Sequence, residues 1–192
     1  MLTFKAQLIH PIKVQKLGID KRYHDDQASF VELNPKDMHD KLCLNEVNRH
    51  WENATSLASD IAKDLNKDSE KEVCEIDKRY FALTMQKDDF RNLDYKQILG
   101  VVNIIEIAST LNHLKFLQVE PSCNYGQKKR KFKDIGKGII DSLKLLFPSR
   151  DITLEALDSS INFYKKNGFK VVSPFGDMRY SPNNIPKFSP KI

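Results

Sequence analysis

The sequence predicts an α/β protein with a mixed central sheet and flanking helices. Residues 72–86, 97–109 and 114–119 are rich in β-branched and aromatic side chains, as expected of strands. Beyond residue 134, helical and strand patterns alternate at short intervals, which is typical of a sheet with parallel pairs. The 192 residues are about one domain in length and no linker-like stretch divides them, so one unit is expected.

The first third of the chain contains a strand pattern followed by a helical pattern. In residues 2–9, LTFKAQLI, apolar side chains alternate with others, which predicts a first strand. Further along, apolar residues recur at helical spacing: Val47, Trp51, Ala54, Ile61 and Leu65. This stripe predicts a helix with Trp51 in the core.

The middle of the chain predicts an antiparallel pair, 72–86 and 97–109, joined by the polar turn KDDFRNLDY. Strand 114–119 is expected to stop before Pro121, because proline has no N–H to donate to a ladder. The alternating elements that follow are helix 135–147, strand 152–157, helix 159–167 and strand 169–172. The second of these helices is expected to end at a left-handed cap on Gly168.

Composition is that of a water-soluble protein. Hydrophobic residues make up 40% and charged residues 30% of the chain. No apolar run approaches the roughly 18 residues that a membrane-spanning helix needs. The N-terminus, MLTFKAQLIHPIKV, lacks a long apolar core followed by a cleavage site, so a cytoplasmic protein without a membrane partner is expected.

The spacing of cysteine and histidine predicts no metal site. Cys43, Cys74 and Cys123 are far apart and form no CxxC pair, so reduced, packed thiols are expected. Four histidines match no ligand motif and are expected at the surface without a role: His10, His24, His39 and His50.

The net charge of +5 and the pI near 9.0 indicate an anionic partner. Positive charge is concentrated in residues 126–137, GQKKRKFKDIGK, against Asp134 alone: Lys128, Lys129, Arg130, Lys131, Lys133 and Lys137. One explanation is a non-enzymatic module that binds RNA or DNA. Only Tyr125 and Phe132 flank the run, however, whereas nucleic-acid binders usually interleave aromatic side chains for stacking.

The two glycines that open helix 135–147 indicate a phosphate site. Without a Cβ at Gly136 and Gly138, a phosphate can approach the unpaired N–H groups at the positive end of the helix. No GxxxxGK[ST] is present, and the first glycine of GxGxxG is missing, so a pyrophosphate in another setting is favoured. A valine at 136 is expected to obstruct the anion and leave the core undisturbed.

Motifs in residues 98–172 resemble those of the GNAT superfamily of N-acetyltransferases, which use acetyl-coenzyme A. The family's phosphate-binding signature, Q/R-x-x-G-x-G/A, is similar to KDIGKG at 133–138, with lysine in place of Gln or Arg. Its later aromatic-Tyr and Gly-Phe pattern is similar to FYKKNGF at 163–169. A strand that ends in Val-x-Pro, here 119–121, precedes both in the family's order.

The resemblance implies a GNAT-like acyl-CoA N-acyltransferase fold over residues 1–192. Acceptor-side elements would occupy 1–70, a coenzyme-binding core 71–172 and a C-terminal segment 173–192. The implied activity is acetyl transfer from acetyl-CoA, the co-substrate, to a primary amine by direct attack and without a metal. The residues implied in coenzyme binding are Gln118, Val119, Lys131, Lys133, Asp134, Ile135, Gly136, Lys137, Gly138 and Ile139.

The resemblance also implies that Tyr164 protonates the departing thiolate. Ordinary packing remains an alternative for this tyrosine, because Ile161 shares its helix face. Amine acetylation is also helped by a carboxylate near the acceptor. The candidates in or near strands are Glu106, Glu120 and Glu155. Strand alternation points Glu155 away from its apolar neighbours, so a solvated rim position is equally open.

The acceptor is left open by the sequence. In the family, the segment after the first strand builds the acceptor pocket, which here implies residues 20–66. The mixed charge of that segment does not distinguish a small molecule, a peptide or aminoacyl-tRNA, the substrate of toxin-like members. A homodimer is left open as well.

Overall fold

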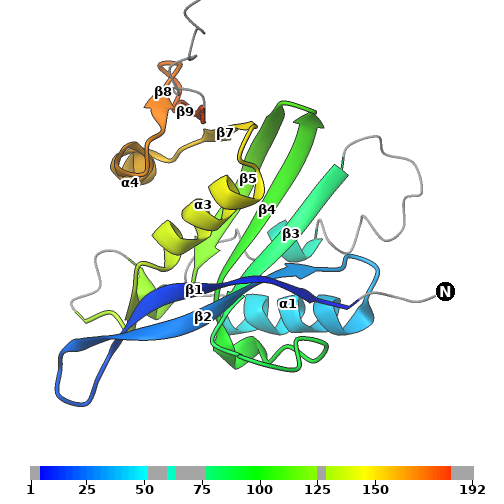
Figure 1. Cartoon of the computed structure of the whole chain (residues 1–192), viewed down its shortest axis with the longest axis vertical. Helices are drawn as coiled ribbons and strands as arrows, with labels where there is room; N and C mark the ends of the chain where they lie inside the picture. Colours follow the sequence, from blue (N-terminus) through cyan, green and yellow to red (C-terminus); the bar gives the residue numbers. More distant parts are fainter. Residues whose placement is uncertain (1–4, 52–59, 64–76, 125–128, 183–192) are drawn as a thin grey trace, which may run out of the picture.

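The computed structural model describes residues 5–51, 60–63, 77–124 and 129–182. The strands form one nine-stranded sheet (Figure 1). In chain order they are β1 (Gln7–Leu17), β2 (Tyr23–Leu33), β3 (Asp77–Thr84), β4 (Ile98–Ala108), β5 (Leu111–Val119), β6 (Phe132–Lys133), β7 (Asp151–Glu155), β8 (Lys170–Val171) and β9 (Asp177–Tyr180). Across the sheet the order is β6-β1-β2-β3-β4-β5-β7-β9-β8.

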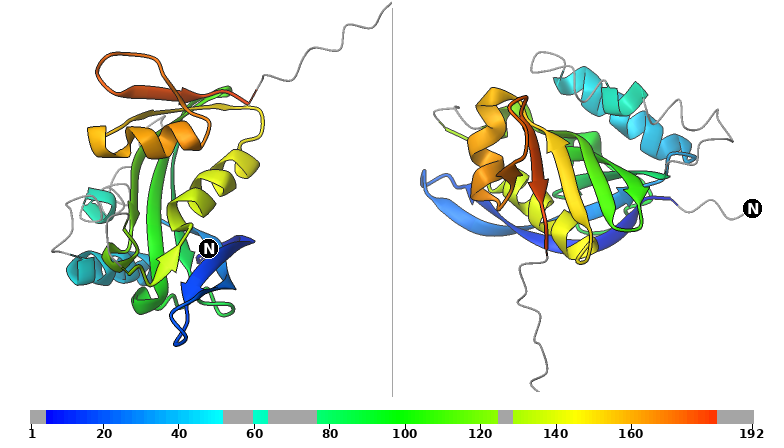
Figure 2. Two further views of the ribbon diagram at one scale, coloured as in Figure 1. Left: turned by 90° about the vertical axis from the view of Figure 1, so that its left-hand side faces the viewer. Right: turned by 90° about the horizontal axis from the view of Figure 1, so that it is seen from above.

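Helices cover both faces of this sheet. The α-helices are α1 (Met38–Trp51), α3 (Ile135–Leu146) and α4 (Ile161–Lys166), and the short 3-10 turns are η1 (Tyr95–Gln97), η2 (Pro121–Cys123) and η3 (Asp158–Ser160). Viewed from above, α1 lies on one side of the sheet and α3 and α4 lie on the other (Figure 2). The predicted mixed sheet with flanking helices is confirmed.

Each face of the sheet carries its own apolar core. On the α3 side, strand residues such as Phe30, Phe81 and Val102 pack with Ile139 of α3. On the α1 side, the alternate strand residues pack with α1, and Trp51 is only 2% exposed. The predicted core position of Trp51 is confirmed.

The first strand differs from its prediction in position and length. β1 starts at Gln7 and continues to Leu17 instead of covering residues 2–9, of which 2–4 lie outside the described part. Pro11 is accommodated within it because β6 pairs with β1 only at Gln15 and Lys16. A proline on an unpaired strand edge removes no ladder hydrogen bond, so it does not end the strand.

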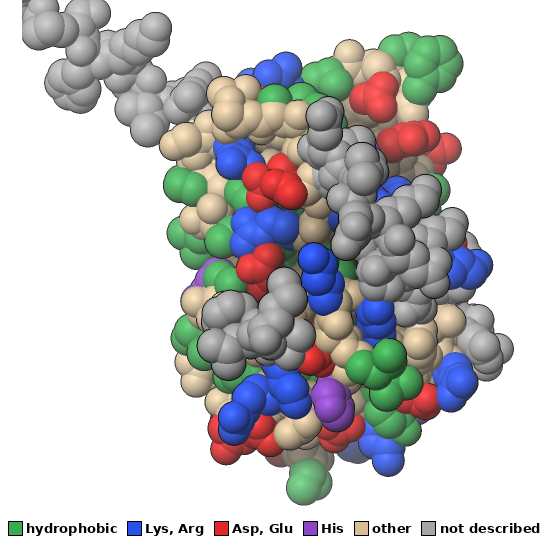
Figure 3. All heavy atoms as spheres, turned by 90° about the vertical axis from the view of Figure 1, so that its right-hand side faces the viewer, with side chains coloured by type: hydrophobic (Ala, Val, Ile, Leu, Met, Phe, Trp, Pro, Cys, Tyr) green, Lys and Arg blue, Asp and Glu red, His purple; other side chains and the backbone are tan. Residues whose placement is uncertain are grey.

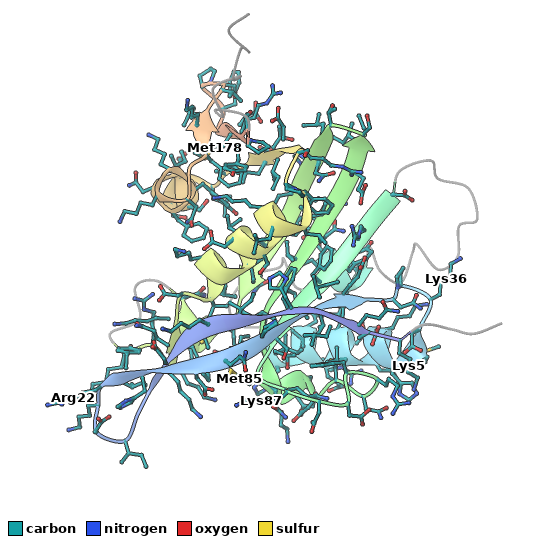
Figure 4. The ribbon with its side chains drawn as sticks, viewed as in Figure 1. Lys5, Arg22, Lys36, Met85, Lys87 and Met178 are labelled. Carbon is teal, nitrogen blue, oxygen red and sulfur yellow. The ribbon has the colours of Figure 1, made fainter. Side chains whose placement is uncertain are left out.

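The predicted elements do not include β2. Its first half is polar and pairs only with β1, whereas its pairing with β3 begins at Ser29. Without a core beneath it, this half of the strand shows no apolar alternation for a sequence analysis to detect. Figure 4 shows Arg22 at the tip of the β1–β2 hairpin, far from both cores.

The middle strands agree with their prediction where the structure describes them; residues 72–76 of the predicted strand 72–86 lie outside the described part. β3 and β4 are antiparallel, from Asp77 opposite Glu106 to Thr84 opposite Ile98. β5 follows as the next antiparallel strand and ends before Pro121. Proline then starts the turn η2, so its missing N–H leaves no gap in the ladder.

The C-terminal strands include one, β9, that is not among the predicted elements. β7 pairs in parallel with β5, which confirms the predicted parallel pair. β8 does not pair with β7, because β9 lies between them and is antiparallel to both. β9 is four residues long, and only its Met178, labelled in Figure 4, is fully buried. A strand this short with one buried residue shows no apolar alternation in the sequence. Helix α4 ends as predicted, with Gly168 at φ 83°.

Three general features follow from the described residues. None of their helices is long and apolar enough to cross a membrane. Cys43 and Cys123 are buried thiols without a disulfide, as predicted, and Cys74 lies outside the described part. Within the same ranges, no group of three His, Cys, Asp or Glu side chains is arranged to hold a metal ion.

Candidate active site

Helix α3 begins with backbone amides that can receive an anion. Asp134, directly before the helix, has φ 64° and ψ 13°, in the left-handed region. The N–H of Gly138 donates to the carbonyl of Asp134 at 2.7 Å. The N–H groups of Ile135, Gly136 and Lys137 precede that bond and therefore have no carbonyl partner within the helix. The predicted glycine-opened helix start is confirmed, and it lies at the positive end of the helix dipole.

Gly136 and Gly138 also permit close packing. A Cβ on Gly136 would lie 3.1 Å from Cζ of Phe163, and a Cβ on Gly138 would lie 2.8 Å from Cγ2 of Ile12. The expectation that a valine at 136 leaves packing undisturbed is therefore wrong, because its side chain would press on the ring of Phe163. Both glycines let α3 approach its neighbours.

The contact between Gly136 and Phe163 brings the two sequence motifs together in space. The neighbouring Tyr164 is 9% exposed, and its ring centroid lies 5.1 Å from that of Phe163 and 5.5 Å from that of Phe169. Burial raises the pKa of Tyr164 to about 12, so its hydroxyl keeps its proton at neutral pH. Within the described part of the chain no residue hydrogen-bonds this hydroxyl, which leaves its proton for a bound group.

β5 and β7 stop pairing before they reach their C-terminal ends. Their parallel ladder joins Leu111–His113 to Asp151–Thr153, and no further rung between them is formed by the described residues. On its other side β5 stays paired with β4, where Val119 lies opposite Gly100. Beyond this rung β5 and β7 diverge, and the end of β5 at Val119 lies near the start of α3.

Gly100 sets how closely α3 approaches this strand end. A Cβ on Gly100 would lie 2.6 Å from Cδ1 of Ile139 and 3.4 Å from the backbone oxygen of Gln118. Ile139 is fully buried, and helix geometry directs its N–H to the carbonyl of Ile135. Ile139 thus supplies packing at the helix start, and its part in coenzyme binding stays a prediction.

The lysines before α3 are held against the β1–β2 hairpin. The carbonyl of Lys131 accepts the N–H of Leu17 at 2.9 Å, and the N–H of Lys131 donates to the carbonyl of Ser122 at 3.3 Å. The Nζ of Lys133 lies 3.5 Å from the ring centroid of Tyr23, a close cation–π contact. These contacts fix the backbone on which α3 starts.

The basic segment is not a uniform positive surface. Lys137 forms an ion pair with Asp141 one turn further along α3. Lys133 is stacked on a tyrosine, and Lys128 lies outside the described residues. A different face of the molecule, the one turned to the viewer in Figure 3, carries positive and negative side chains interspersed.

Glu106 lies away from this region and is held by arginines. It accepts hydrogen bonds from Arg79 and Arg150. Burial acts to raise its pKa, but the two guanidinium groups outweigh burial and lower the pKa below its usual value. Glu106 is paired opposite Asn112, at the other end of β4 from Gly100, and its part as a base stays a prediction.

The other two predicted carboxylates differ from each other in setting. Oε2 of Glu120 accepts hydrogen bonds from Oγ of Ser122 at 2.5 Å and from Sγ of Cys123 at 3.0 Å. Glu155 is exposed at the end of β7, opposite in direction to the buried Leu154, as alternation predicts. Glu120 is thus engaged in its own turn, whereas Glu155 faces solvent.

Solved structures resemble this chain in fold, although no family profile and no curated protein sequence matches it. A proposed N-acetyltransferase from Lactobacillus plantarum aligns over 80% of this chain and 97% of its own, with 10% identity and a TM-score of 0.55. A proposed acetyltransferase from Exiguobacterium aligns over 80% and 93%, with 14% identity and a TM-score of 0.51. Ard1 from Thermoplasma volcanium aligns over 80% and 97%, with 16% identity and a TM-score of 0.50.

The chain has the GNAT fold. The likeness extends over nearly the whole length of the proteins compared, so the sheet and its helices correspond as one unit. At identities of 10–16% it concerns the fold, and the roles of single residues have to be argued from this site.

One residue at the parting strands of the GNAT fold is missing from the predicted site. His113 lies on β5 opposite Thr153, on the last parallel rung, with its Nδ1 3.2 Å from Oγ1 of Thr153. Burial lowers the pKa of His113, while Glu155 and Asp177 act to raise it. A single histidine within a strand has no spacing signal; only the strand pairing shows that it lies where β5 and β7 part.

A groove of about 570 Å³ adjoins the helix start on its other side, between β1 and α3. Its lining includes Asp134, Lys137 and Gly138 from the start of α3. On the β1 side, Nε2 of His10 lies 2.9 Å from Oγ of Ser142 on α3. This contact ties the edge of the sheet to the helix that carries the amides.

Proposed function

We propose that this protein transfers the acetyl group of acetyl-CoA to a primary amine by direct attack. The observation that carries the proposal is the contact between Gly136 and Phe163. It joins an anion-receiving helix start to a helix with a buried, protonated tyrosine, beside strands that part. The GNAT fold supports acyl transfer as the class of reaction.

The coenzyme would lie along the start of α3 and the parted edge of β5. Its pyrophosphate would accept hydrogen bonds from the N–H groups of Ile135, Gly136 and Lys137, aided by the helix dipole. Lys131 and Lys133 add positive charge just before the helix. Two further residues shape the backbone: Asp134, through its left-handed conformation, and Gly138, through its close approach to β1.

The pantetheine arm would continue along the end of β5. Beyond the last parallel rung, no strand of the described residues pairs with the side of β5 that faces β7. An extended amide chain can add hydrogen bonds to such an edge in the manner of an extra strand. Gln118 and Val119, whose other side is paired with β4, are the proposed partners.

The leaving group would be served by Tyr164. In the transfer the amine nitrogen bonds to the thioester carbon, the carbon–sulfur bond breaks, and the sulfur takes the electron pair and a proton. A tyrosine with a pKa of about 12 is a weaker acid than a thiol, whose usual pKa is about 8.5. Its hydroxyl would therefore stabilise the sulfur mainly as a hydrogen-bond donor.

The acceptor is proposed as a primary amine of a small molecule or a peptide. The segment proposed to contact it, residues 20–66, contributes β2 and α1 to the described structure. A nucleic-acid-binding module has less support, because Lys137 is paired with Asp141 and few aromatic side chains flank the basic run. No contact of the described residues favours aminoacyl-tRNA as acceptor.

Binding and kinetics test the proposal. Acetyl-CoA at 100 times its Kd should add about 2.7 kcal/mol to the unfolding free energy in a thermal-shift titration, and a random RNA oligomer at equal charge should not. Direct attack requires a ternary complex, so initial rates at varied acetyl-CoA and amine should give intersecting lines in a double-reciprocal plot. Parallel lines would indicate a covalent acetyl-enzyme and contradict direct attack. Stabilisation by RNA alone would contradict the acetyltransferase itself.

A further inference from the structure

We propose that Nε2 of His113 accepts the proton of the attacking amine and that Thr153 positions the imidazole for this role. The proposal rests on the acetyltransferase function proposed above and names the base that this function requires. It is carried by three features of the described residues: the place of His113 in the sheet, the hydrogen bonds of Thr153, and the charges around the ring.

His113 occupies the last parallel rung before β5 and β7 part. Leu114 of β5 and Leu154 of β7, the residues that follow this rung, belong to the core beneath α3. Alternation along the strands therefore directs His113 and Thr153 to the opposite face of the sheet. A coenzyme on the α3 side and an acceptor from the other face would meet where the strands part, next to His113.

The hydrogen bonds of Thr153 decide which imidazole nitrogen carries the proton. Oγ1 of Thr153 lies 3.3 Å from the backbone carbonyl oxygen of Asn112 and 3.2 Å from Nδ1 of His113. A carbonyl can only accept, so the single hydroxyl proton goes to Asn112 and the threonine oxygen accepts from Nδ1–H. In the neutral ring the lone pair is then on Nε2, and no other residue in the described part of the chain occupies that nitrogen.

The charges around the ring suit a base that must be neutral before the reaction. Burial is the largest influence and lowers the pKa of His113 below 6.5, and Lys115 on β5 acts in the same direction. Glu155 on β7 and Asp177 on β9 act to raise the pKa without outweighing burial. The imidazole is thus unprotonated at neutral pH, and the two carboxylates stabilise it once it has taken a proton.

His113 meets the requirements of a base better than the three glutamates. The carboxylate of Glu106 is bound by two arginines. Oε2 of Glu120 accepts from a hydroxyl and a thiol of its own turn. Glu155 is exposed on the same face as His113, so we infer that it acts through its charge on the imidazole.

The proposed transfer conserves protons and electron pairs. The nitrogen of the neutral amine bonds to the thioester carbon, and a proton of that nitrogen moves to Nε2 of His113. As the carbon–sulfur bond breaks, the sulfur takes the bonding pair while the hydroxyl of Tyr164 donates a hydrogen bond to it. The first products are the acetylated amine and the thiolate of coenzyme A; the imidazolium then loses its proton to water, and the thiolate takes one from water.

The test compares His113→Asn with the wild type. Asparagine keeps an N–H donor near the place of Nδ1 and removes the base at Nε2, so the bond to Thr153 can survive. Release of coenzyme A from acetyl-CoA is measured with benzylamine and, separately, with water as acceptor. We expect a fall in kcat of about 10² or more with acetyl-CoA affinity retained, since general base catalysis contributes about 10²- to 10⁴-fold. Asp88→Asn, which alters an exposed side chain outside the proposed site, is the control and should leave both rates unchanged.

The pH profile and NMR give a readout that a packing role would not change. With water as acceptor, kcat of the wild type should fall at acid pH with an apparent pKa below 6.5, and His113→Asn should lose that limb. Long-range ¹⁵N–¹H spectra of the wild type should show the Nδ1–H tautomer at His113. Thr153→Val should depopulate this tautomer and lower kcat, whereas Thr153→Ser, which keeps the hydroxyl, should retain both.

Two results would overturn the role of His113 while leaving the acetyltransferase function in place. One is an unchanged kcat and acid limb in a folded His113→Asn variant. The other is an Nε2–H tautomer in the wild type. Failure of the function itself is distinct, because calorimetry would then show no binding of acetyl-CoA to the wild type; that result would refute the function and the role of His113 together.

Discussion

Asp40 is a carboxylic acid buried at the start of α1. It is 1% exposed; its Oδ2 accepts the N–H of Asn34 at 2.8 Å, whereas its Oδ1 has no partner among the described residues. Burial raises its pKa to about 6, and Asp37 adds to the rise, while Asn34 and Lys5 oppose it. Figure 4 shows Lys5 at the end of the molecule where α1 begins. Ionisation of Asp40 therefore opposes folding at neutral pH.

We predict that Asp40→Asn removes a pH dependence of stability. The folded state binds this proton more tightly than the unfolded state, whose pKa is the ordinary 3.8. The unfolding free energy of the wild type should therefore be undiminished below pH 3.8 and decline as the pH rises through about 6, by on the order of 2 kcal/mol. Urea unfolding of the variant should show a flatter curve over this range and greater stability at pH 7.

Asp88→Asn is the matched control for this prediction, because Asp88 is an exposed aspartate. Between pH 4 and 6, the unfolding free energy of this variant should change with pH as steeply as that of the wild type. Equal slopes in the wild type and Asp40→Asn would show that Asp40 is not held protonated by burial.

Tyr164→Phe is predicted to reduce turnover without unfolding the protein. The ring contacts with Phe163 and Phe169 remain, and only the hydroxyl is lost. We expect kcat to fall by about 10²-fold, the low end for a general acid, because a thiolate leaves without full protonation. Stopped-flow or steady-state rates should be measured where chemistry limits turnover, alongside calorimetry with acetyl-CoA.

Tyr164→Phe should have the same melting temperature as Tyr95→Phe, which removes the hydroxyl of a tyrosine outside the proposed site. A kcat equal to the wild-type value would assign Tyr164 to packing and leave the acid elsewhere.

At the scale of elements, the contact between α3 and β4 decides where the helix start lies. The absent Cβ of Gly100 leaves the space that Cδ1 of Ile139 fills, at 2.6 Å from the position a Cβ would take. Ile139 is 0% exposed, so its side chain cannot turn toward water. The amides of α3 are thereby placed next to the end of β5 by one glycine and one isoleucine.

We predict that two exchanges of size across this contact compensate each other. Gly100→Ala should cost about 1–3 kcal/mol through overpacking, and Ile139→Val about 0.5–1.5 kcal/mol through a lost methyl group. Ile139→Val removes the atom that the new Cβ would strike. The double variant should therefore be more stable than the sum of the single effects, by about 1 kcal/mol or more in urea unfolding.

The control pair is Gly138→Ala with Ile139→Val. A Cβ at 138 meets Ile12 and not Ile139, so these two effects should be close to additive. Additivity in the Gly100 pair would contradict the close approach of α3 to β4.

At the scale of the whole molecule, one ion-pair network joins strands to the segment that follows α3. Arg79 of β3 binds Glu32 of β2 through two hydrogen bonds, at 2.6 and 2.8 Å, and Glu106 of β4 at 3.3 Å. Arg150 also binds Glu106, and both guanidinium groups lie over the ring of Phe147, at 5.3 and 5.6 Å. The network holds the C-terminal end of α3 to the sheet.

Glu106→Gln is predicted to destabilise the protein by about 1–3 kcal/mol at pH 7, because it leaves two partly buried guanidinium groups short of negative charge. The folded pKa of Glu106 is lowered, so its contribution is present above its ordinary pKa of 4.5 and is lost as the pH falls through the folded pKa. The difference between wild type and variant should therefore shrink below pH 4.5, which chemical unfolding at several pH values measures.

Asp25→Asn, which breaks an exposed pair with Lys13, should change stability by less than about 1 kcal/mol at every pH. If Glu106→Gln also lowers the unfolding free energy by less than about 1 kcal/mol, the arginine network does not hold α3 to the sheet.

The elements predicted from the sequence are those that bury a continuous apolar face. The stripe of α3 and the β-branched runs of β3 and β4 show their periodicity because each packs against a core. Three glycines indicated local structure correctly. A Cβ at Gly136 or Gly138 would press on a neighbouring side chain, and Gly168 has a left-handed backbone. By itself, then, the sequence determined the class of the fold, the helix start and the helix that carries Tyr164.

The tertiary structure decided what depends on which strands are neighbours. The polar half of β2 and the single buried residue of β9 give no periodicity, because little of either contacts a core. Glu106 and His113 are both polar residues in predicted strands, and the register places one among arginines and the other on the last rung before the strands part. A chain's pattern records the burial of each residue, whereas the chemistry of a site depends on which distant residues are brought into contact, and that follows only from the pairing of strands.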